Sequence, residues 1–193
     1  MSKTTLILAS SSPFRKALLE RLMIPFSVSV PDIDETPKPH ETPEQLVERL
    51  AVEKAETVAG CHPGALVIGS DQVAVHGEAV VGKPANHGEA VRQLRDASGK
   101  RITLYTGLAV IDGTGRTQSD VVPYSVQFRA LDDGLIERYL RKEQPYGCSG
   151  SLRADGLGIA LLEKFNGDDP TALIGLPLIR LVRMLEYVGL RVV

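Results

Sequence analysis

The chain has 193 residues, of which 43% are hydrophobic and 24% are charged, and its formal net charge is −2. These values are typical of a globular protein that forms one domain or two tightly joined lobes. The slightly acidic balance argues against a protein that wraps nucleic acid with a basic face, and no apolar run approaches the ~18 residues that a membrane span requires. A small anionic ligand held by a few local cations is compatible with this composition.

The N-terminal segment predicts an anion site. Residues 4–9 form a short apolar run typical of a buried strand, residues 10–12 are three serines, and residues 13–23 form a helix with a serine N-cap and a proline at its first position. Free N–H groups at the helix N-terminus, the serine hydroxyls, Arg15 and Lys16 together make a phosphate cradle. The alternative is an ordinary strand-to-helix connection with two solvated cations.

The rest of the chain alternates between predicted strands and helices, which favours a mixed α/β fold. A turn at His76-Gly77 and a capping box from Thr42 to Gln45 are typical of a hairpin and a helix start. The expected strands are residues 26–30, 65–69, 73–75, 101–111, 116–129 and 157–162. The further expected helices are residues 42–60, 87–97 (capped by Asn86), 132–143 and 177–187.

The cysteines and histidines give little sign of a metal cluster. Cys61 and Cys148 lie far apart without metal-ligand spacing, and the N-terminal apolar run is too short for a signal sequence. We therefore expect reduced thiols in a cytoplasmic protein. The histidines fall in predicted loops, turns or helix ends, which favours surface histidines: His40, His62, His76 and His87.

Four further polar residues are candidates for chemistry. Asp71 follows a predicted strand near its carboxyl end, where open α/β sheets place ligands, and a carboxylate there can bind a hard cation or accept a proton from water. Its structural alternative is capping a turn. Glu35 lies in an acidic loop that is equally well a solvated face. Lys83 precedes a proline that restricts it to extended conformations, and Lys54 lies near an apolar helix face from which it can also reach solvent.

Several common catalytic motifs are missing from the sequence. It contains no G-x-x-x-x-G-K-[ST], no G-x-G-x-x-G, no H-E-x-x-H and no G-x-S-x-G. The sequence therefore lacks the usual signals of a P-loop, a dinucleotide fold, a zinc protease and a hydrolase triad.

The candidate residues occur within a series of short motifs in one order. These are Leu8-Ala9-Ser10-Ser11-Ser12-Pro13-Phe14-Arg15, Asp34-Glu35, Glu53-Lys54-Ala55, Gly69-Ser70-Asp71-Gln72, Gly82-Lys83-Pro84, Tyr105-Thr106-Gly107, residues 139–142 and Gly156-Leu157-Gly158-Ile159-Ala160. Each motif is weak alone, but the ordered set is specific. The chain resembles the Maf family of nucleoside triphosphate pyrophosphatases, and the resemblance covers essentially its whole length.

The resemblance implies hydrolysis of a nucleoside triphosphate between its α- and β-phosphates, giving the monophosphate and diphosphate. It also implies a single domain over residues 1–193, with an elongated mixed sheet flanked by helices, like that of inosine triphosphatases, and two lobes around a cleft. A cytoplasmic homodimer without a nucleic-acid polymer or membrane partner is expected.

The resemblance also assigns roles to residues. Asp71 matches the catalytic aspartate, which orients or deprotonates the attacking water. Glu35 and Asp71 are expected to hold Mg²⁺ or Mn²⁺. A triphosphate brings about four negative charges, so the site also needs fixed cations and hydrogen-bond donors. The expected phosphate-binding residues are Ser10, Arg15, Lys54 and Lys83.

Three positions bear on the base. The branch of the family acting on dTTP and UTP carries a second arginine in the first loop and a threonine after the catalytic aspartate, whereas this chain has Phe14 and Gln72. It resembles the branch that hydrolyses 7-methyl-GTP, whose cationic purine favours an aromatic face and a nearby carboxylate. Phe14 and Asp155 are the candidates, although a glutamate is expected in place of Asp155. The alternatives are that Phe14 packs on a helix and Asp155 caps a turn.

A role of a different class is a nucleotide-binding regulator of cell-division arrest, which has been linked to this family. A pure binder needs the cations but has little need of a water-activating carboxylate. Because Asp71 and Glu35 are both present, the sequence favours the enzyme.

Overall fold

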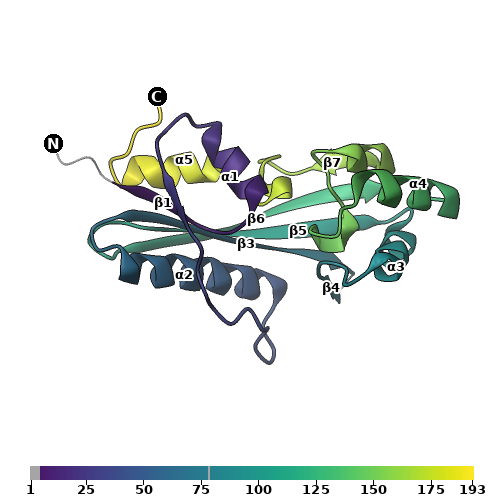
Figure 1. Ribbon diagram of the computed structural model, residues 1–193, viewed down its shortest axis with the longest axis horizontal. Helices are drawn as coiled ribbons and strands as arrows, with labels where there is room; N and C mark the ends of the chain where they lie inside the picture. The colour runs from purple at the N-terminus through teal and green to yellow at the C-terminus, as the bar shows by residue number, and fades with distance from the viewer. Residues whose placement is uncertain (1–4, 78) are drawn as a thin grey trace.

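The computed structural model describes residues 5–77 and 79–193 and contains a seven-stranded mixed sheet with helices on both faces (Figure 1). The strand order is β2-β1-β3-β5-β6-β7, with β4 paired to β3; β1 is parallel to β2 and β3, and the other pairs are antiparallel. The strands are β1 (Leu6–Ala9), β2 (Ser27–Ser29), β3 (Leu66–His76), β4 (Ala79–Val81), β5 (Arg101–Ile111), β6 (Thr117–Phe128) and β7 (Leu162–Asn166). The predicted mixed α/β class is confirmed, and Thr4 of the predicted first strand lies outside the described residues.

The helices begin where the sequence predicts. They are α1 (Pro13–Glu20), α2 (Pro43–Cys61), α3 (His87–Ala97), α4 (Asp133–Glu143) and α5 (Leu178–Tyr187). The side chains of Ser12, Thr42 and Asn86 each accept a hydrogen bond from the backbone N–H three residues later, and the predicted capping box is complete. Helix α1 ends before the predicted Met23, whose φ is 55°. Within the described part of the chain, none of the helices has the length and apolarity to cross a bilayer.

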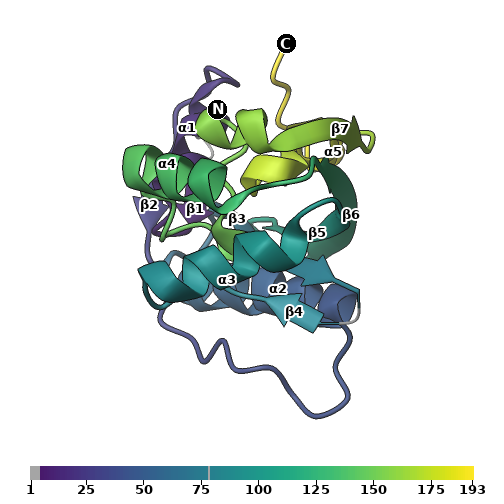
Figure 2. The ribbon, with the colours of Figure 1, turned by 90° about the vertical axis from the view of Figure 1, so that its right-hand side faces the viewer.

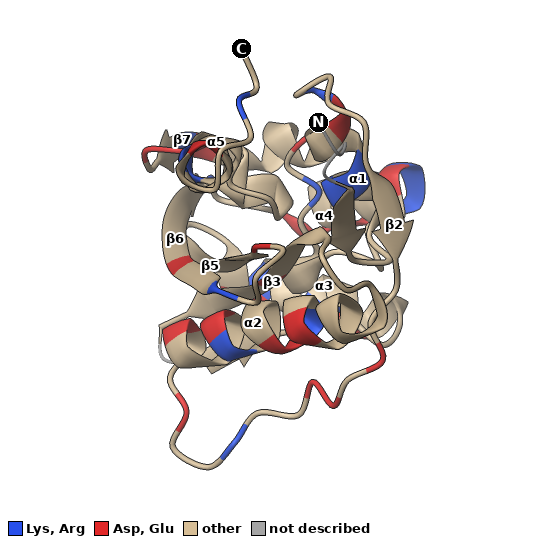
Figure 3. Ribbon diagram, turned by 90° about the vertical axis from the view of Figure 1, so that its left-hand side faces the viewer, with Lys and Arg blue, Asp and Glu red and all other residues tan. Residues whose placement is uncertain are grey.

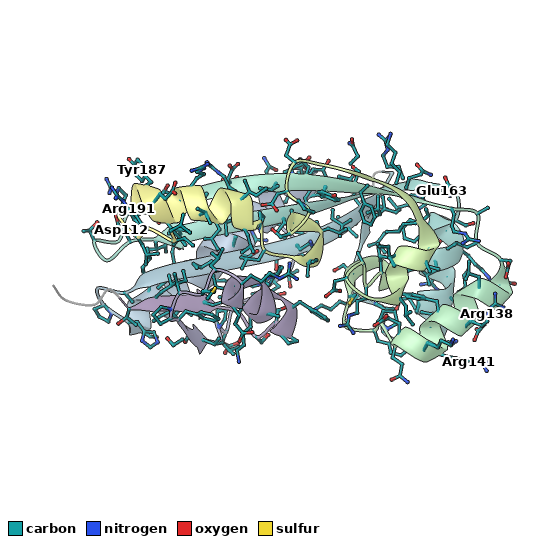
Figure 4. All side chains as sticks on the ribbon, turned by 90° about the horizontal axis from the view of Figure 1, so that it is seen from above. Asp112, Arg138, Arg141, Glu163, Tyr187 and Arg191 are labelled. Carbon is teal, nitrogen blue, oxygen red and sulfur yellow. The ribbon has the colours of Figure 1, made fainter. Side chains whose placement is uncertain are left out.

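The helices divide the molecule into two lobes along its length. In the first lobe, α1 and α5 cover one face of the sheet and α2 covers the other (Figure 1). In the second lobe, α3 and α4 pack together, with Leu94 and Ile136 both fully buried in one apolar cluster (Figure 2). Figure 4 places Asp112 and Tyr187 at one end of the long axis and Arg138 at the other. The expected elongated sheet, flanked by helices, is thus confirmed.

The segment around Asp71 is one continuous strand. The sequence predicts separate strands at 65–69 and 73–75, but β3 runs unbroken from Leu66 to His76. The pairing with β5 continues through the polar residues, with Asp71 opposite Gly107. The predicted division into two strands was wrong because ladder pairing on one side of the strand outweighs the low strand propensity of the residues between them.

The predicted strand at 157–162 was also wrong. Residues Leu157–Leu161 form a short 3-10 helix, and β7 starts only at Leu162. The backbone N–H of Gly158 donates to the carbonyl oxygen of Arg153, and a Cβ at Gly158 would overlap that carbonyl. The chain therefore folds back on itself here, and the apolar pattern reflects a tight turn.

Helix α2 lies unusually close to the sheet because two glycines face it. A Cβ at Gly69 of β3 would overlap the carbonyl oxygen of Ala51, and a Cβ at Gly107 of β5 would overlap that of Val47. The helix backbone therefore rests directly on the strands. On its other side, charged residues follow one another along α2 and through the loop that precedes it (Figure 3).

We expect Gly107→Ala to lower the free energy of unfolding by about 1–3 kcal/mol, because the added methyl group pushes α2 off the sheet. The control is Gly60→Ala, in α2 itself, because no atom lies within 4 Å of the new methyl group there. It should leave stability unchanged or raise it by about 0.5–1 kcal/mol through helix propensity. Urea denaturation measures both, and equal stability of the two variants would contradict the close-packing argument.

Candidate active site

A cavity opens where β3 changes partners. Strand β3 pairs with β1 through residues 66–69 and with β4 through residues 74–76, so among the described strands residues 70–73 have no partner on that side. The resulting cavity, of about 600 Å³, is lined by residues from both lobes, which confirms the predicted cleft. All the residues singled out through the family resemblance line it: Ser10, Phe14, Arg15, Glu35, Lys54, Asp71, Gln72, Lys83 and Asp155.

The turn after β1 supplies one wall of the cavity. Ser10 is buried, and its Oγ accepts hydrogen bonds from the backbone N–H of Ser12 at 3.1 Å and from Arg15 Nη1 at 3.4 Å. Burial lowers the pKa of Arg15, but the nearby charges of Asp71 and Glu35 act in the opposite direction, and a guanidinium keeps its proton in any case. Lys16 does not belong to this wall, because it pairs with Glu20 on the surface.

Lys54 joins two carboxylates at the centre of the cavity. It projects from α2, is only 5% exposed, and its Nζ lies 2.6 Å from Asp71 Oδ1 and 2.8 Å from Glu35 Oε1. A buried ammonium is stable only when it is paired, so the alternative of a lysine that reaches solvent is wrong. Asp71 is 8% exposed and lies inside a strand, so it does not cap a turn.

Glu35 reaches the cavity from the acidic loop before α2. Its side chain is 60% exposed, yet its carboxylate is bound to Lys54. Partial burial raises the pKa of Glu35, but the hydrogen bond and charge of Lys54, together with the charges of Lys83 and Arg15, lower it by more. Glu35 is therefore a carboxylate in the site rather than part of a purely solvated face.

The second lobe contributes Lys83 from the loop after β4. The carbonyl oxygen of the preceding Gly82 accepts hydrogen bonds from the backbone N–H of Gly150 at 3.1 Å and from Gln93 Nε2 at 3.2 Å. This fixes the loop to the segment that carries Cys148 and Asp155. Cys148 and the distant Cys61 are both free, as expected.

Phe14 and Asp155 are connected by an arginine that sequence reasoning missed. The guanidinium carbon of Arg153 lies 5.2 Å from the centroid of the Phe14 ring, and its Nε lies 3.4 Å from Asp155 Oδ1. Its Nη1 also binds Glu143 Oε1 at 2.9 Å. The sequence signal for Arg153 is its position two residues before Asp155, but nothing in the pattern shows that the side chain turns toward Phe14, far away in the chain.

The loop between β7 and α5 is a second element that the sequence did not reveal. Its Gly175 carbonyl oxygen accepts hydrogen bonds from Arg15 Nε and from Ser70 Oγ, both at 2.9 Å. Gln72 Nε2 donates to the Ala172 carbonyl oxygen at 2.6 Å. Gly175 has a φ of 116°, which favours glycine. The loop thus positions Arg15 and holds the amide of Gln72 against the wall.

The buried Asp169 stabilises this loop. Its Oδ1 accepts a hydrogen bond from the backbone N–H of Thr171 at 3.0 Å, and its Oδ2 accepts one from the N–H of Ile179 at 2.8 Å, in the first turn of α5. A carboxylate at this helix N-terminus satisfies a free N–H group and is stabilised by the helix dipole.

The combination of a serine turn, four cations and three carboxylates in one cavity is consistent with the family indicated by the motifs. The model of the Maf-like protein family matches residues 5–188. The chain belongs to this family. A relative from Nitrosococcus oceani, named 7-methyl-GTP pyrophosphatase, is 55% identical over 96% of this chain and 94% of its own. A relative with the same name from Nitrosospira multiformis is 54% identical over 97% of this chain and 96% of its own. Another from Pseudomonas fluorescens is 55% identical over 95% of this chain and 96% of its own.

Solved structures are more distant from this member of the Maf-like family. A HAM1 protein from Coxiella burnetii is 18% identical, with a TM-score of 0.46 over 65% of this chain and 73% of its own. The Ham1 protein of Staphylococcus aureus is 16% identical, with a TM-score of 0.47 over 65% and 72%. The family assignment rests on the sequence relatives.

Lys54→Met should raise the pKa of Glu35, because the lysine contacts that lower it are lost. At neutral pH the variant should also lose about 3–5 kcal/mol of stability, since the buried Asp71 carboxylate is left unpaired. The wild-type pairing with Glu35 adds stability above the ordinary pKa of 4.5, and this contribution disappears as the pH falls through the lowered folded-state value, so the part of the stability difference that comes from Glu35 should disappear in acid. Carboxyl NMR titration and urea denaturation at several pH values measure these effects.

Lys38→Met is the control for this change. Lys38 forms a surface pair with Glu53 at 3.6 Å and belongs to the loop before α2. Surface pairs contribute little, so we expect no change in the pKa of Glu35 and a loss of stability below about 1 kcal/mol. A similar NMR shift in both variants would contradict the assignment of Lys54 as the residue that holds Glu35.

Proposed function

We propose that this protein hydrolyses 7-methyl-GTP between the α- and β-phosphates, producing 7-methyl-GMP and diphosphate. The observation that carries the proposal is the buried Lys54 ammonium, which joins Asp71 and Glu35 in a cavity that also contains the serine turn and Arg15. The names of the relatives from Nitrosococcus, Nitrosospira and Pseudomonas support the choice of substrate.

Cations and N–H groups on three sides of the cavity suit the triphosphate. Arg15 and the N-terminus of α1 lie on one wall, Lys54 extends from α2, and Lys83 extends from the second lobe. A triphosphate carries about four negative charges, and more negative charge develops on the diphosphate as it leaves. We assign these groups to the phosphate oxygens, where their fixed positions stabilise that charge without reorganisation.

Glu35 and Asp71 fit a divalent cation. One oxygen of each carboxylate binds the Lys54 ammonium, at 2.8 Å for Glu35 Oε1 and 2.6 Å for Asp71 Oδ1, which leaves Glu35 Oε2 and Asp71 Oδ2 as the oxygens that would hold the ion. Mg²⁺ is commonly held by one or two carboxylates together with substrate phosphates, and we propose Mg²⁺ or Mn²⁺ here. When bound, the ion supplies Lewis-acid polarisation of a phosphoryl oxygen and lowers the pKa of water.

Asp71 is assigned the proton transfer. Lys54 holds its Oδ1, which fixes the orientation of the carboxylate and leaves Oδ2 to accept a proton from the attacking water. The water oxygen forms a bond to the α-phosphorus. The bond between that phosphorus and the oxygen that bridges it to the β-phosphate breaks, and diphosphate departs. Arg15 is held by Gly175, so its charge stays directed at the same place throughout.

Phe14 and Asp155 are assigned to the base. Methylation at N7 gives guanine a delocalised positive charge, which is attracted to the face of an aromatic ring. Asp155 can balance that charge and accept hydrogen bonds from N1–H and the N2 amino group. Gln72 lines the same cavity, but its amide nitrogen already binds Thr106 Oγ1 at 2.9 Å, so we assign it to shaping the wall.

A cytoplasmic homodimer remains a prediction of the sequence. Analytical ultracentrifugation tests the assembly. The second role considered above is that of a regulator of cell-division arrest, and no separate feature of the described residues favours it. A variant that binds nucleotide but does not hydrolyse it would separate the two roles, because only the enzymatic role requires turnover.

Asp71→Asn should reduce kcat for 7-methyl-GTP by about 10²–10⁴-fold, because the amide no longer accepts the proton from water. Diphosphate release in the presence of Mg²⁺ or Mn²⁺ measures turnover, and chelation should remove the wild-type activity. Asp168→Asn changes an exposed carboxylate that does not line the cavity and should keep full activity. Near-normal turnover by a folded Asp71→Asn variant would show the assignment to be wrong.

Phe14→Leu should raise KM for 7-methyl-GTP by about 3- to 30-fold, since a cation–π contact of about 0.5–2 kcal/mol is lost. The variant should therefore prefer 7-methyl-GTP over GTP less strongly than the wild type does. A panel of 7-methyl-GTP, GTP, dTTP and UTP measures both effects. Phe165→Leu, on β7 outside the cavity, is the matched control and should leave the panel unchanged. A clear wild-type preference for dTTP or UTP would contradict the proposed substrate and favour the other branch.

A further inference from the structure

A side chain of the protein already covers the aromatic face assigned to the base. The Arg153 guanidinium carbon lies 5.2 Å from the Phe14 ring centroid, and Arg153 Nε lies 3.4 Å from Asp155 Oδ1. Phe14 and Arg153 both line the cavity, and the guanidinium lies over one face of the ring. A planar cation therefore makes, within the protein itself, the two contacts that 7-methylguanine would need.

We propose that Arg153 is an internal competitor for the base: it occupies the base subsite of the free protein, and the incoming nucleotide displaces it from Phe14 and Asp155. This inference rests on the proposed function, because it uses the same ring and carboxylate. It adds Arg153 as a specificity-determining residue, which acts by competing with the base and by leaving the subsite when the nucleotide binds.

Charge explains why displacement is expected rather than stacking of the guanidinium on the base. A 7-methylguanine ring and a guanidinium group both carry positive charge, and two like charges at stacking distance repel each other strongly in a partly desolvated cavity. Arg153 already lies over the Phe14 ring and binds the Asp155 carboxylate. The base and Arg153 therefore compete for the same two partners.

Glu143 provides a pivot for the displaced side chain. Its carboxylate is 7% exposed, accepts a hydrogen bond from Arg153 Nη1 at 2.9 Å, and is also bound by the backbone N–H of Leu157. Arg153 itself is 39% exposed, so it has room to move toward solvent. The guanidinium can leave Phe14 and Asp155 while its bond to Glu143 keeps it at the edge of the cavity.

The backbone of Arg153 has separate structural duties that its side chain does not share. Its N–H donates to the Tyr139 hydroxyl oxygen at 2.9 Å, and its carbonyl oxygen accepts hydrogen bonds from the N–H groups of Gly156 and Gly158. A side-chain substitution leaves these bonds in place. Arg153→Ala is therefore expected to fold, because Glu143 keeps its hydrogen bond from the backbone N–H of Leu157.

The decisive experiment is to compare steady-state kinetics of the wild type and Arg153→Ala with 7-methyl-GTP and GTP. Removal of the competitor should lower KM for 7-methyl-GTP by about two- to five-fold, the size of one partly exposed cation–π contact, with kcat unchanged. The fall for GTP should be smaller, because its neutral base is not repelled by a displaced guanidinium. Calorimetric binding of 7-methyl-GMP should show the same gain in affinity without turnover.

Two further variants complete the test. In a Phe14→Leu background, Arg153→Ala should give a smaller gain, because one of the two competed partners has been removed and only Asp155 remains. Arg141→Ala changes an exposed arginine of α4 that pairs with Glu137 at 3.2 Å (Figure 4). It should alter neither the KM for 7-methyl-GTP nor the KM for GTP. A higher KM in Arg153→Ala would overturn the proposal by showing that the arginine contacts the substrate, and an unchanged KM would overturn it by showing no competition.

Failure of the proposed function is visible separately, in the wild type alone. If the wild type prefers a nucleotide other than 7-methyl-GTP, the substrate assignment fails, and the comparison is repeated with the preferred nucleotide. A lower KM for that nucleotide in Arg153→Ala then still supports occupation of the base subsite by Arg153, whereas an unchanged or higher KM overturns it.

Discussion

The burial of one lysine ammonium between a helix and a sheet sets the geometry of the whole site. Lys54 reaches Asp71 because α2 rests on β3 and β5 at two residues without side chains, Gly69 and Gly107. A buried ammonium in turn requires carboxylate partners, which fixes Asp71 and draws in Glu35 from the loop before the helix. Close packing and charge pairing thus depend on each other.

The cavity separates two kinds of recognition along its length. Around Asp71 the groups are fixed by strands, helices and a loop carbonyl, which suits a reaction that depends on positioned charges. Around Phe14 the contacts involve a half-exposed arginine from the second lobe, which suits selection among ligands of similar shape. Fixed contacts and the contacts of a half-exposed side chain therefore lie side by side in one cleft.

Local signals in the sequence predicted most of the elements, because N-caps such as Ser12 and Thr42 and the long alternating strands leave clear patterns. The ordered motifs predicted the family and led to a set of residues that share one cavity. The errors have a common physical cause. The unbroken β3, the turn at Gly158 and the side chain of Arg153 all depend on partners distant in sequence or on backbone overlap, neither of which residue periodicity encodes.

The change of partners along β3 also determines how the molecule can move. On one side β3 passes from β1 to β4, but on the other it stays paired with β5 from Val67 to Val75, and β5 stays paired with β6 along its whole length. The long strands β3, β5 and β6 therefore run from one lobe into the other. Among the described residues, no flexible linker separates the two lobes. We therefore expect access to the cleft to depend on side chains and loops at its rim rather than on rotation of one lobe against the other.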